Sequence, residues 1–144
     1  MKTWLVVGDP DNWLVALRNK VWGVRETPRH TSIWRMISAG DRLVFYATTP
    51  VSGIIGMGKV TRRFRDESLL WPKEIARGHT IWPHRFGFQV DAVLPSDRWE
   101  TDKLKLDGVT ILVRGGFQRL GEDLVDEIVE KMKNTGLGKT TPKS

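Results

Sequence analysis

The change of hydrophobic period near Asp41 constrains the fold of this chain more than any other feature of its sequence. Before this point the apolar residues of two segments recur at helical spacing, whereas residues 42–48 and 53–63 are strand-forming runs that flank a short turn. Residues 85–94 alternate between apolar and other residues and predict a further strand, and residues 110–114 predict another. The second part of the chain is therefore expected to form a mostly antiparallel sheet.

Two helix-start signals precede this change. Asp9 and Thr27 are both typical N-cap residues, and each is followed directly by proline, which is favoured at the first position of a helix. An apolar strand over residues 3–7 comes before both helices, and a last helix is expected over residues 121–133. Continuous strand–helix–strand alternation is missing. The sequence thus predicts an α+β fold, a small curved sheet or barrel with helices packed against it, rather than a parallel nucleotide-binding sheet.

Charge is unevenly distributed along the chain. The net charge is +6, but residues 1–85 carry 14 Lys and Arg against 7 Asp and Glu, and residues 86–130 carry 5 against 10. Residues 131–144 carry four lysines and no acid. A one-sided basic surface is typical of proteins that bind polyanions, although many proteins without such a ligand have one. We expect a single domain over residues 1–134 and a flexible basic tail over residues 135–144.

The absence of cysteine and of long apolar runs narrows the class of protein. The chain has no Cys, which excludes disulfides, thiolate metal sites and cysteine nucleophiles. No apolar run approaches the length of a membrane-spanning helix, and the first residues do not have the pattern of a signal peptide. We therefore expect a cytoplasmic protein that does not act at a membrane.

No catalytic or metal-binding motif stands out. Residues 53–59 have the GxxxxGK spacing of a phosphate-binding loop, but Val60 stands where Ser or Thr is required, and the segment continues as a strand. Glycines inside a strand are more typical of a bulge, a sharp bend or the close approach of another backbone. The three His residues lack metal-ligand spacing, and no nucleophile motif occurs. The sequence predicts neither an enzyme nor a bound metal or cofactor.

Tryptophan is unusually frequent, with seven residues against one Tyr and five Phe. We assign Trp4 and Trp34 to the core, because each lies in the apolar run of its strand or helix. Segments 22–25 and 82–85 each bring an indole close to an arginine, and the second of them ends a long irregular segment over residues 66–83. A pocket for an unpaired base requires such parts, because an aromatic ring stacks on the base and a guanidinium contacts phosphate.

An ordered series of short motifs gives the chain a family resemblance. The series begins with Trp4-Leu5-Val6-Val7 and Trp22-Gly23-Val24-Arg25, continues through residues 33–37, 40–46 and 53–60, and ends with Trp82-Pro83-His84-Arg85-Phe86 and the closing helix. With these motifs the chain resembles the EVE domain family of the PUA-like superfamily, to which the YTH readers of methylated RNA bases also belong. The resemblance spans nearly the whole domain. It implies a PUA-like small mixed β-barrel flanked by helices, with a pocket for a modified or flipped base and no reaction.

The resemblance also implies roles for individual residues. Trp22 is the first choice for a stacking platform, and the other base-binding candidates are Tyr46, Trp82, Gly23, Asp9 and Asn12. The phosphate-binding candidates are Arg25, Arg29 and Arg85. One motif departs from the family. Val7-Gly8-Asp9-Pro10 replaces a Lys-Ser-Glu-Pro-like segment that EVE domains often carry after the first strand, so the resemblance does not extend to the choice of base.

The resulting hypothesis is a non-catalytic domain that binds RNA or DNA, through one modified base held in an aromatic pocket. The main alternative is a hydrolase or nuclease acting on modified nucleic acid, which requires carboxylates or histidines gathered around a metal. A second alternative is a protein-interaction module that uses the acidic segment 86–130.

Overall fold

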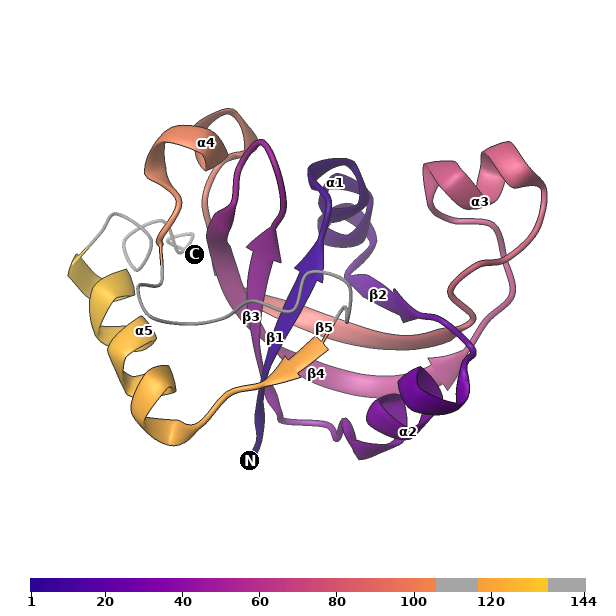
Figure 1. Cartoon of the computed structure of the whole chain (residues 1–144), viewed down its shortest axis with the longest axis horizontal. Coiled ribbons are helices and arrows are strands. Elements are labelled where there is room, and N and C mark those ends of the chain that lie inside the picture. Colours follow the sequence, from indigo (N-terminus) through magenta and orange to yellow (C-terminus); the bar gives the residue numbers. More distant parts are fainter. Residues whose placement is uncertain (106–116, 135–144) are drawn as a thin grey trace.

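A mixed sheet of six strands organises the described part of the chain. The computed structural model describes residues 1–105 and 117–134, and the strands follow the order β2-β5-β4-β3-β1-β6 (Figure 1). The strands are β1 (Thr3–Gly8), β2 (Val21–Val24), β3 (Arg42–Ala47), β4 (Gly53–Arg65), β5 (His84–Val93) and β6 (Phe117–Arg119). The helices are α1 (Pro10–Asn19), α2 (Pro28–Met36), α3 (Pro72–Arg77), α4 (Trp99–Asp102) and α5 (Glu122–Asn134), with a short 3-10 turn at Ser96–Arg98.

Both predicted helix starts are confirmed. The Asp9 carboxylate accepts a hydrogen bond from the backbone N–H of Asn12 at 2.7 Å, and the Thr27 hydroxyl accepts one from the N–H of His30 at 3.1 Å. In each helix proline follows the cap directly. The strand expected over residues 110–114 and the basic tail lie outside the described residues.

Asp41, near which the hydrophobic period changes, also connects distant parts of the fold. The buried Asp41 carboxylate accepts hydrogen bonds from the Trp4 indole at 3.0 Å, and from the backbone N–H groups of Ser38 at 2.9 Å and Lys2 at 3.1 Å. Burial alone would raise the pKa of Asp41, but these hydrogen bonds and the Lys2 charge hold it below its ordinary value. Trp4 is 3% exposed, which confirms its assignment to the core.

Close backbone approach explains the glycine-rich segment at the start of β4. A Cβ at Gly56 would lie 2.5 Å from the carbonyl oxygen of Ala92, and a Cβ at Gly58 would lie 2.1 Å from that of Gln89. Both carbonyls belong to β5, and the β4–β5 register shifts between Met57 and Gly58. The segment is a bulged strand, as its sequence predicted, and not a phosphate-binding loop.

The sheet curls into a half-barrel. β1 pairs in parallel with β3, and the other pairs are antiparallel, so the sheet is mixed. β5 and β6 are separated in the strand order by β4, β3 and β1. Nevertheless the rings of Phe86 on β5 and Phe117 on β6 are 5.8 Å apart. This contact requires the sheet to bend back on itself, and the helices flank the resulting half-barrel (Figure 1).

Segment 66–83 is more ordered than its sequence suggested. It carries the short helix α3, which stands away from the sheet at the right of Figure 1. Residues 21–24 form a regular strand, β2, at the edge of the sheet. Among the described residues, no helix has the length and apolar character needed to cross a membrane.

Candidate functional site

A cleft lined by three tryptophans lies between α1, β2, the start of α2 and loop 66–83, and we call it the pocket. Its volume is about 150 Å³. An engineered cavity of about 150 Å³ in another protein holds one benzene ring, so the pocket matches a single planar ring. Its lining residues are Val7, Gly8, Asn12, Trp22, Gly23, Val24, Arg25, His30, Trp71, Trp82 and Phe117.

One side of the pocket, the sheet wall, consists of Trp22 backed by Trp13. The two indoles stack with centroids 4.3 Å apart and an angle of 24° between their planes. The Trp13 indole N–H donates to the carbonyl of Tyr46 at 2.8 Å, which fixes this pair to β3. A Cβ at Gly8 would lie 2.2 Å from the Trp22 ring. Gly8, which stands where the sequence departs from the family pattern, therefore makes room for the Trp22 ring.

A second side of the pocket, the loop wall, consists of Trp71 and Trp82 from loop 66–83. Their rings meet edge to face, with centroids 5.6 Å apart. Trp71 also contacts Trp22 edge to face at 6.2 Å, and its indole N–H donates to the carbonyl of Asn12 at 3.3 Å. A Cβ at Gly23 would lie 2.6 Å from the Cβ of Trp82 and 2.8 Å from the Trp71 ring. The loop wall thus packs directly on β2, and glycine is the residue that permits it.

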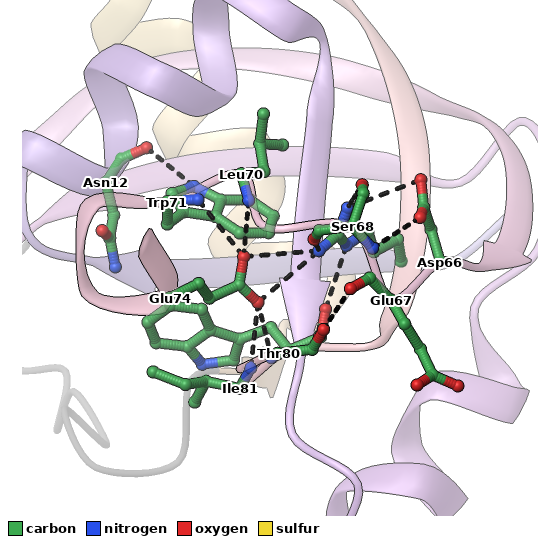
Figure 2. A network of polar contacts seen from close by, with 11 residues as sticks. Asn12, Asp66, Glu67, Ser68, Leu70, Trp71, Glu74, Thr80 and Ile81 are labelled. Atoms are coloured by element: carbon green, nitrogen blue, oxygen red, sulfur yellow. Dashed lines mark hydrogen bonds and ion pairs between the residues drawn. The ribbon is translucent and has the colours of Figure 1, made fainter. Parts of the chain in front are cut away.

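A buried carboxylate, Glu74, holds the loop wall from behind (Figure 2). One of its oxygens accepts hydrogen bonds from the N–H groups of Leu70 and Trp71, and the other accepts them from Ile81 and Trp82. Burial alone would raise the pKa of Glu74, but these backbone hydrogen bonds hold it below its ordinary value. The carboxylate is therefore ionised at neutral pH although Glu74 is fully buried.

Arg85 is a partner of this carboxylate, and the structure corrects its expected phosphate-binding role. The side chain is 1% exposed. Its Nε donates to the carbonyl of Trp82 at 3.0 Å, and its Nη1 donates to the hydroxyl of Ser68 at 3.1 Å. Its Nη2 lies 3.4 Å from the Glu74 carboxylate. A guanidinium enclosed by protein groups in this way has no face open to a phosphate.

Polar groups of the pocket remain open to a ligand. The N–H of Phe88 donates to the carbonyl of Lys20 at 3.0 Å, which makes residues 20, 22 and 24 the hydrogen-bonded positions of the β2–β5 pair. The N–H and C=O of Gly23 consequently point to the other edge of β2, where no strand pairs within the described sheet. The side-chain amide of Asn12 has no hydrogen-bond partner among the described residues. Together these groups can donate to and accept from the edge of a base.

The other predicted site residues fall at different places. Arg25 lies at the rim, with its guanidinium 5.8 Å from the centre of the Trp82 ring. Arg29 is exposed in the first turn of α2. Asp9 caps α1, and Tyr46 is half-buried against the core; neither residue lines the pocket. The structure therefore brings together Trp22, Gly23, Trp82, Asn12 and Arg25.

Sequence reasoning missed Trp71, Glu74 and His30. His30 lines the pocket, and its Nδ1 is 2.7 Å from the Thr27 hydroxyl, so the ring belongs to the helix cap. Trp71-Pro72 followed by an acid at position 74 has the form of a helix start, and this signal lay inside a segment expected to be irregular. Among the described residues, no three His, Asp or Glu side chains are grouped to hold a metal ion.

Trp34 on α2 and His84 on β5 form a second aromatic pair. Their rings stack at 4.4 Å, and the Trp34 indole N–H donates to the carbonyl of Arg85 at 3.0 Å. Trp34 is half-buried and packs against the edge of the core, so its assignment to the core is confirmed only in part. Burial lowers the pKa of His84 below its ordinary value, although the nearby Glu26 carboxylate acts in the opposite direction.

Several solved structures share the fold of this chain over most of its length. The apo YTH domain of Toxoplasma CPSF4 is 13% identical, has a TM-score of 0.59, and aligns over 94% of this chain and 88% of its own. The YTH domain of Zygosaccharomyces rouxii MRB1, solved in complex with N6-methyladenosine RNA, is 10% identical, with a TM-score of 0.57 and coverage of 94% and 89%. A mutant of ZmASCH from Zymomonas mobilis is 14% identical, with a TM-score of 0.58 and coverage of 90% and 98%.

These likenesses confirm the PUA-like fold that the sequence predicted. No curated protein is significantly similar to this chain in sequence. The family model of the EVE domain matches residues 2–87, which include β1 to β4, the loop wall and the start of β5. Because this match covers more than half of the chain, the protein belongs to the EVE domain family.

Proposed function

We propose that this protein is a non-catalytic nucleic-acid-binding domain that takes one base of a single strand, a modified base in particular, into the pocket. The observation that carries the proposal is the combination of three tryptophans and a strand edge around a cavity the size of one ring. An aromatic face stacks on any base, whereas the N–H and C=O groups at the edge select among bases.

The charge around the pocket supports the same function. Arg25 lies at the rim and Arg29 is exposed on α2, and neither is paired with a carboxylate within the described residues. A base inside the pocket leaves its phosphates outside, where these guanidinium groups meet them. Arg65, by contrast, is paired with Glu26 at 2.6 Å and with Glu67 at 3.2 Å, so it is a weaker candidate for the same contact.

One structural neighbour suggests RNA and a methylated base as the first ligands to test. The Zygosaccharomyces rouxii YTH domain is described in complex with N6-methyladenosine RNA. This likeness, at 10% identity, is one of fold, and binding measurements identify the base that the pocket prefers. A panel of bases is therefore more informative than a single oligonucleotide.

Fluorescence anisotropy with short single-stranded RNA and DNA tests the proposal. Each oligonucleotide carries one candidate base, which is plain or methylated, and a free nucleoside of the same kind serves as competitor. We expect saturable binding that weakens steeply with salt, because neutralised phosphates release counterions. Insertion of a base into the pocket would be contradicted if all oligonucleotides bound with equal affinity and the free nucleoside did not compete with them.

A matched pair of variants on α1 sharpens this test. Asn12→Ala removes the open amide from the pocket, and we expect an affinity loss of about 2- to 10-fold for the preferred base, the usual effect of one hydrogen bond. Asn19→Ala is the control, because its side chain donates to the carbonyl of Val15 at the exposed end of the same helix. Equal affinities of the two variants would exclude Asn12 from base recognition.

The alternative of a hydrolase or nuclease is tested separately. We expect no turnover when the protein is incubated with plain and modified DNA, RNA and nucleoside triphosphates in the presence of Mg²⁺, Mn²⁺ or Zn²⁺. Reproducible product that disappears with a His30→Ala variant would establish an enzyme instead, since His30 lines the pocket and an imidazole can act as a general acid or base.

A further inference from the structure

We propose that Glu74 and Arg85 are positioning residues that hold the loop wall in its binding geometry before any ligand arrives. The benefit for base binding rests on the proposed function, whereas the preassembly of the wall does not. The consequence is a pocket whose affinity depends on two side chains that never touch the ligand.

The loop is closed at its base, and Trp71, which is 2% exposed, is its one fully buried large apolar side chain. The N–H of Asp66 donates to the carbonyl of Pro83 at 2.9 Å, so the two ends of the loop lie side by side. At its far end Ile75 is 61% exposed and Leu69 is 43% exposed. Hydrophobic burial therefore fixes the Trp71 ring but not the far end of the loop, and the shape of the remaining segment depends on polar contacts inside the loop.

Glu74 is the centre of these polar contacts. Its Oε1 accepts from Leu70 at 2.9 Å and Trp71 at 3.2 Å, before α3. Its Oε2 accepts from Ile81 at 3.0 Å and Trp82 at 3.1 Å, after α3. One carboxylate thus connects the segments before and after α3, at the residues that carry the indoles of the loop wall (Figure 2).

Arg85 ties this carboxylate to the sheet. It belongs to β5, which pairs with both β2 and β4. From there its guanidinium contacts Glu74, the Trp82 carbonyl and Ser68, and it lies 5.1 Å from the centre of the Trp71 ring. Both indoles of the loop wall are therefore placed relative to the sheet wall by one charged pair.

The energetics indicate a positioning role for this pair. A buried ion pair is weak evidence for overall stability, because the cost of desolvating both charges offsets their attraction. An apolar pair of the same volume would fill the loop equally well but would leave four N–H groups without an acceptor. What the charged pair adds is one defined arrangement of the loop and its two indoles.

Hydrogen exchange followed by NMR tests the proposal on the unliganded protein. Glu74→Gln places an NH₂ donor against two N–H groups, and we expect exchange at Leu70, Trp71, Ile81 and Trp82 to become about 10- to 100-fold faster. Glu67→Gln is the control, because this carboxylate lies on the same loop, is exposed and pairs with Arg65. Amides of β3 are expected to keep their protection in both variants.

Two results would overturn the proposal. The first is that loop amides exchange no faster in Glu74→Gln than in Glu67→Gln. The second is that β3 amides of Glu74→Gln accelerate by the same factor as its loop amides, which would mean a loss of global stability only. Should Glu74→Gln fail to fold, Ser68→Ala decides, because it removes one Arg85 acceptor and leaves Glu74 intact. We then expect a smaller acceleration confined to the loop, and unchanged loop exchange would refute the proposal.

Binding measurements on the same variants separate this inference from the proposed function. If wild-type protein binds no oligonucleotide, the proposed function fails while the exchange data still decide whether the loop wall is held by Glu74. If wild-type protein binds, we expect Glu74→Gln to lose affinity for the preferred base and Glu67→Gln to retain it. If Glu74→Gln kept full affinity although its loop amides exchanged faster, preassembly of the loop wall would not be needed for base binding.

Discussion

The two walls of the pocket present the same kind of side chain but are stabilised by different physics. In the sheet wall, Trp22 stacks on the fully buried Trp13 and belongs to the hydrophobic core. In the loop wall, Trp71 and Trp82 are held by backbone N–H groups on a buried carboxylate. We therefore expect a change in the sheet wall to lower the stability of the whole fold, whereas the loop wall can be loosened with less effect on the core.

Removing the Trp22 side chain should have the largest effect, and we expect this effect on the free energy of unfolding. Trp22 is 6% exposed, so Trp22→Ala empties a large buried site and is expected to cost about 3–5 kcal/mol of unfolding free energy. Chemical denaturation followed by circular dichroism measures this cost. A loss below about 1 kcal/mol would show that the sheet wall is as loosely held as the loop wall.

Removing Trp82 should affect binding more than stability. Trp82 is half-buried at the rim, and we expect Trp82→Ala to weaken binding of the preferred base by about 1–3 kcal/mol, the contribution of one base–aromatic stack. Anisotropy and a denaturation curve on the same sample give both quantities. The comparison of the walls breaks down if Trp82→Ala destabilises the protein as much as Trp22→Ala does.

Acid should loosen the loop wall. The pKa of Glu74 in the folded protein lies below its ordinary value of 4.5, so the stabilisation from this carboxylate is fully present above pH 4.5. It is lost as the pH falls from there through the lower pKa of the folded state. Acrylamide quenching of tryptophan fluorescence during an acid titration is expected to rise in this range. Glu74→Gln lacks the titrating group, so its quenching should already be high at neutral pH and change less with acid.

Removing the rim guanidinium should have the smallest effect. Arg25 lies over the Trp82 ring and is expected to contact one phosphate. For Arg25→Gln we expect the salt dependence of log affinity to decrease by about one unit of slope, with base preference unchanged. Anisotropy over a salt series measures the slope. Arg98→Gln is the control, because Arg98 is exposed and pairs with Asp102, away from the pocket. A change of base preference in Arg25→Gln would place this residue in the pocket instead of on the phosphate.

Local signals in the sequence determined the order of elements. Asp9 and Thr27 predict the starts of their helices because an N-cap side chain accepts a hydrogen bond from the N–H three residues later. Strands β3, β4 and β5 follow from the runs of strand-forming residues, and the glycines of β4 mark where β5 comes close. The motif series further indicated the family and, within it, the pocket residues Trp22, Gly23 and Trp82.

Only the tertiary structure decided which charged and aromatic side chains are partners. Arg85 looks like an exposed phosphate ligand in the sequence, since nothing nearby reveals that Glu74, eleven residues earlier, turns back to meet it. Trp71 joins the pocket through contacts with Asn12 and Trp22, which are about 50 to 60 residues away along the chain. The physical reason is that caps and strand patterns are decided by neighbours in sequence, whereas burial of a charge is decided by whatever the fold brings against it.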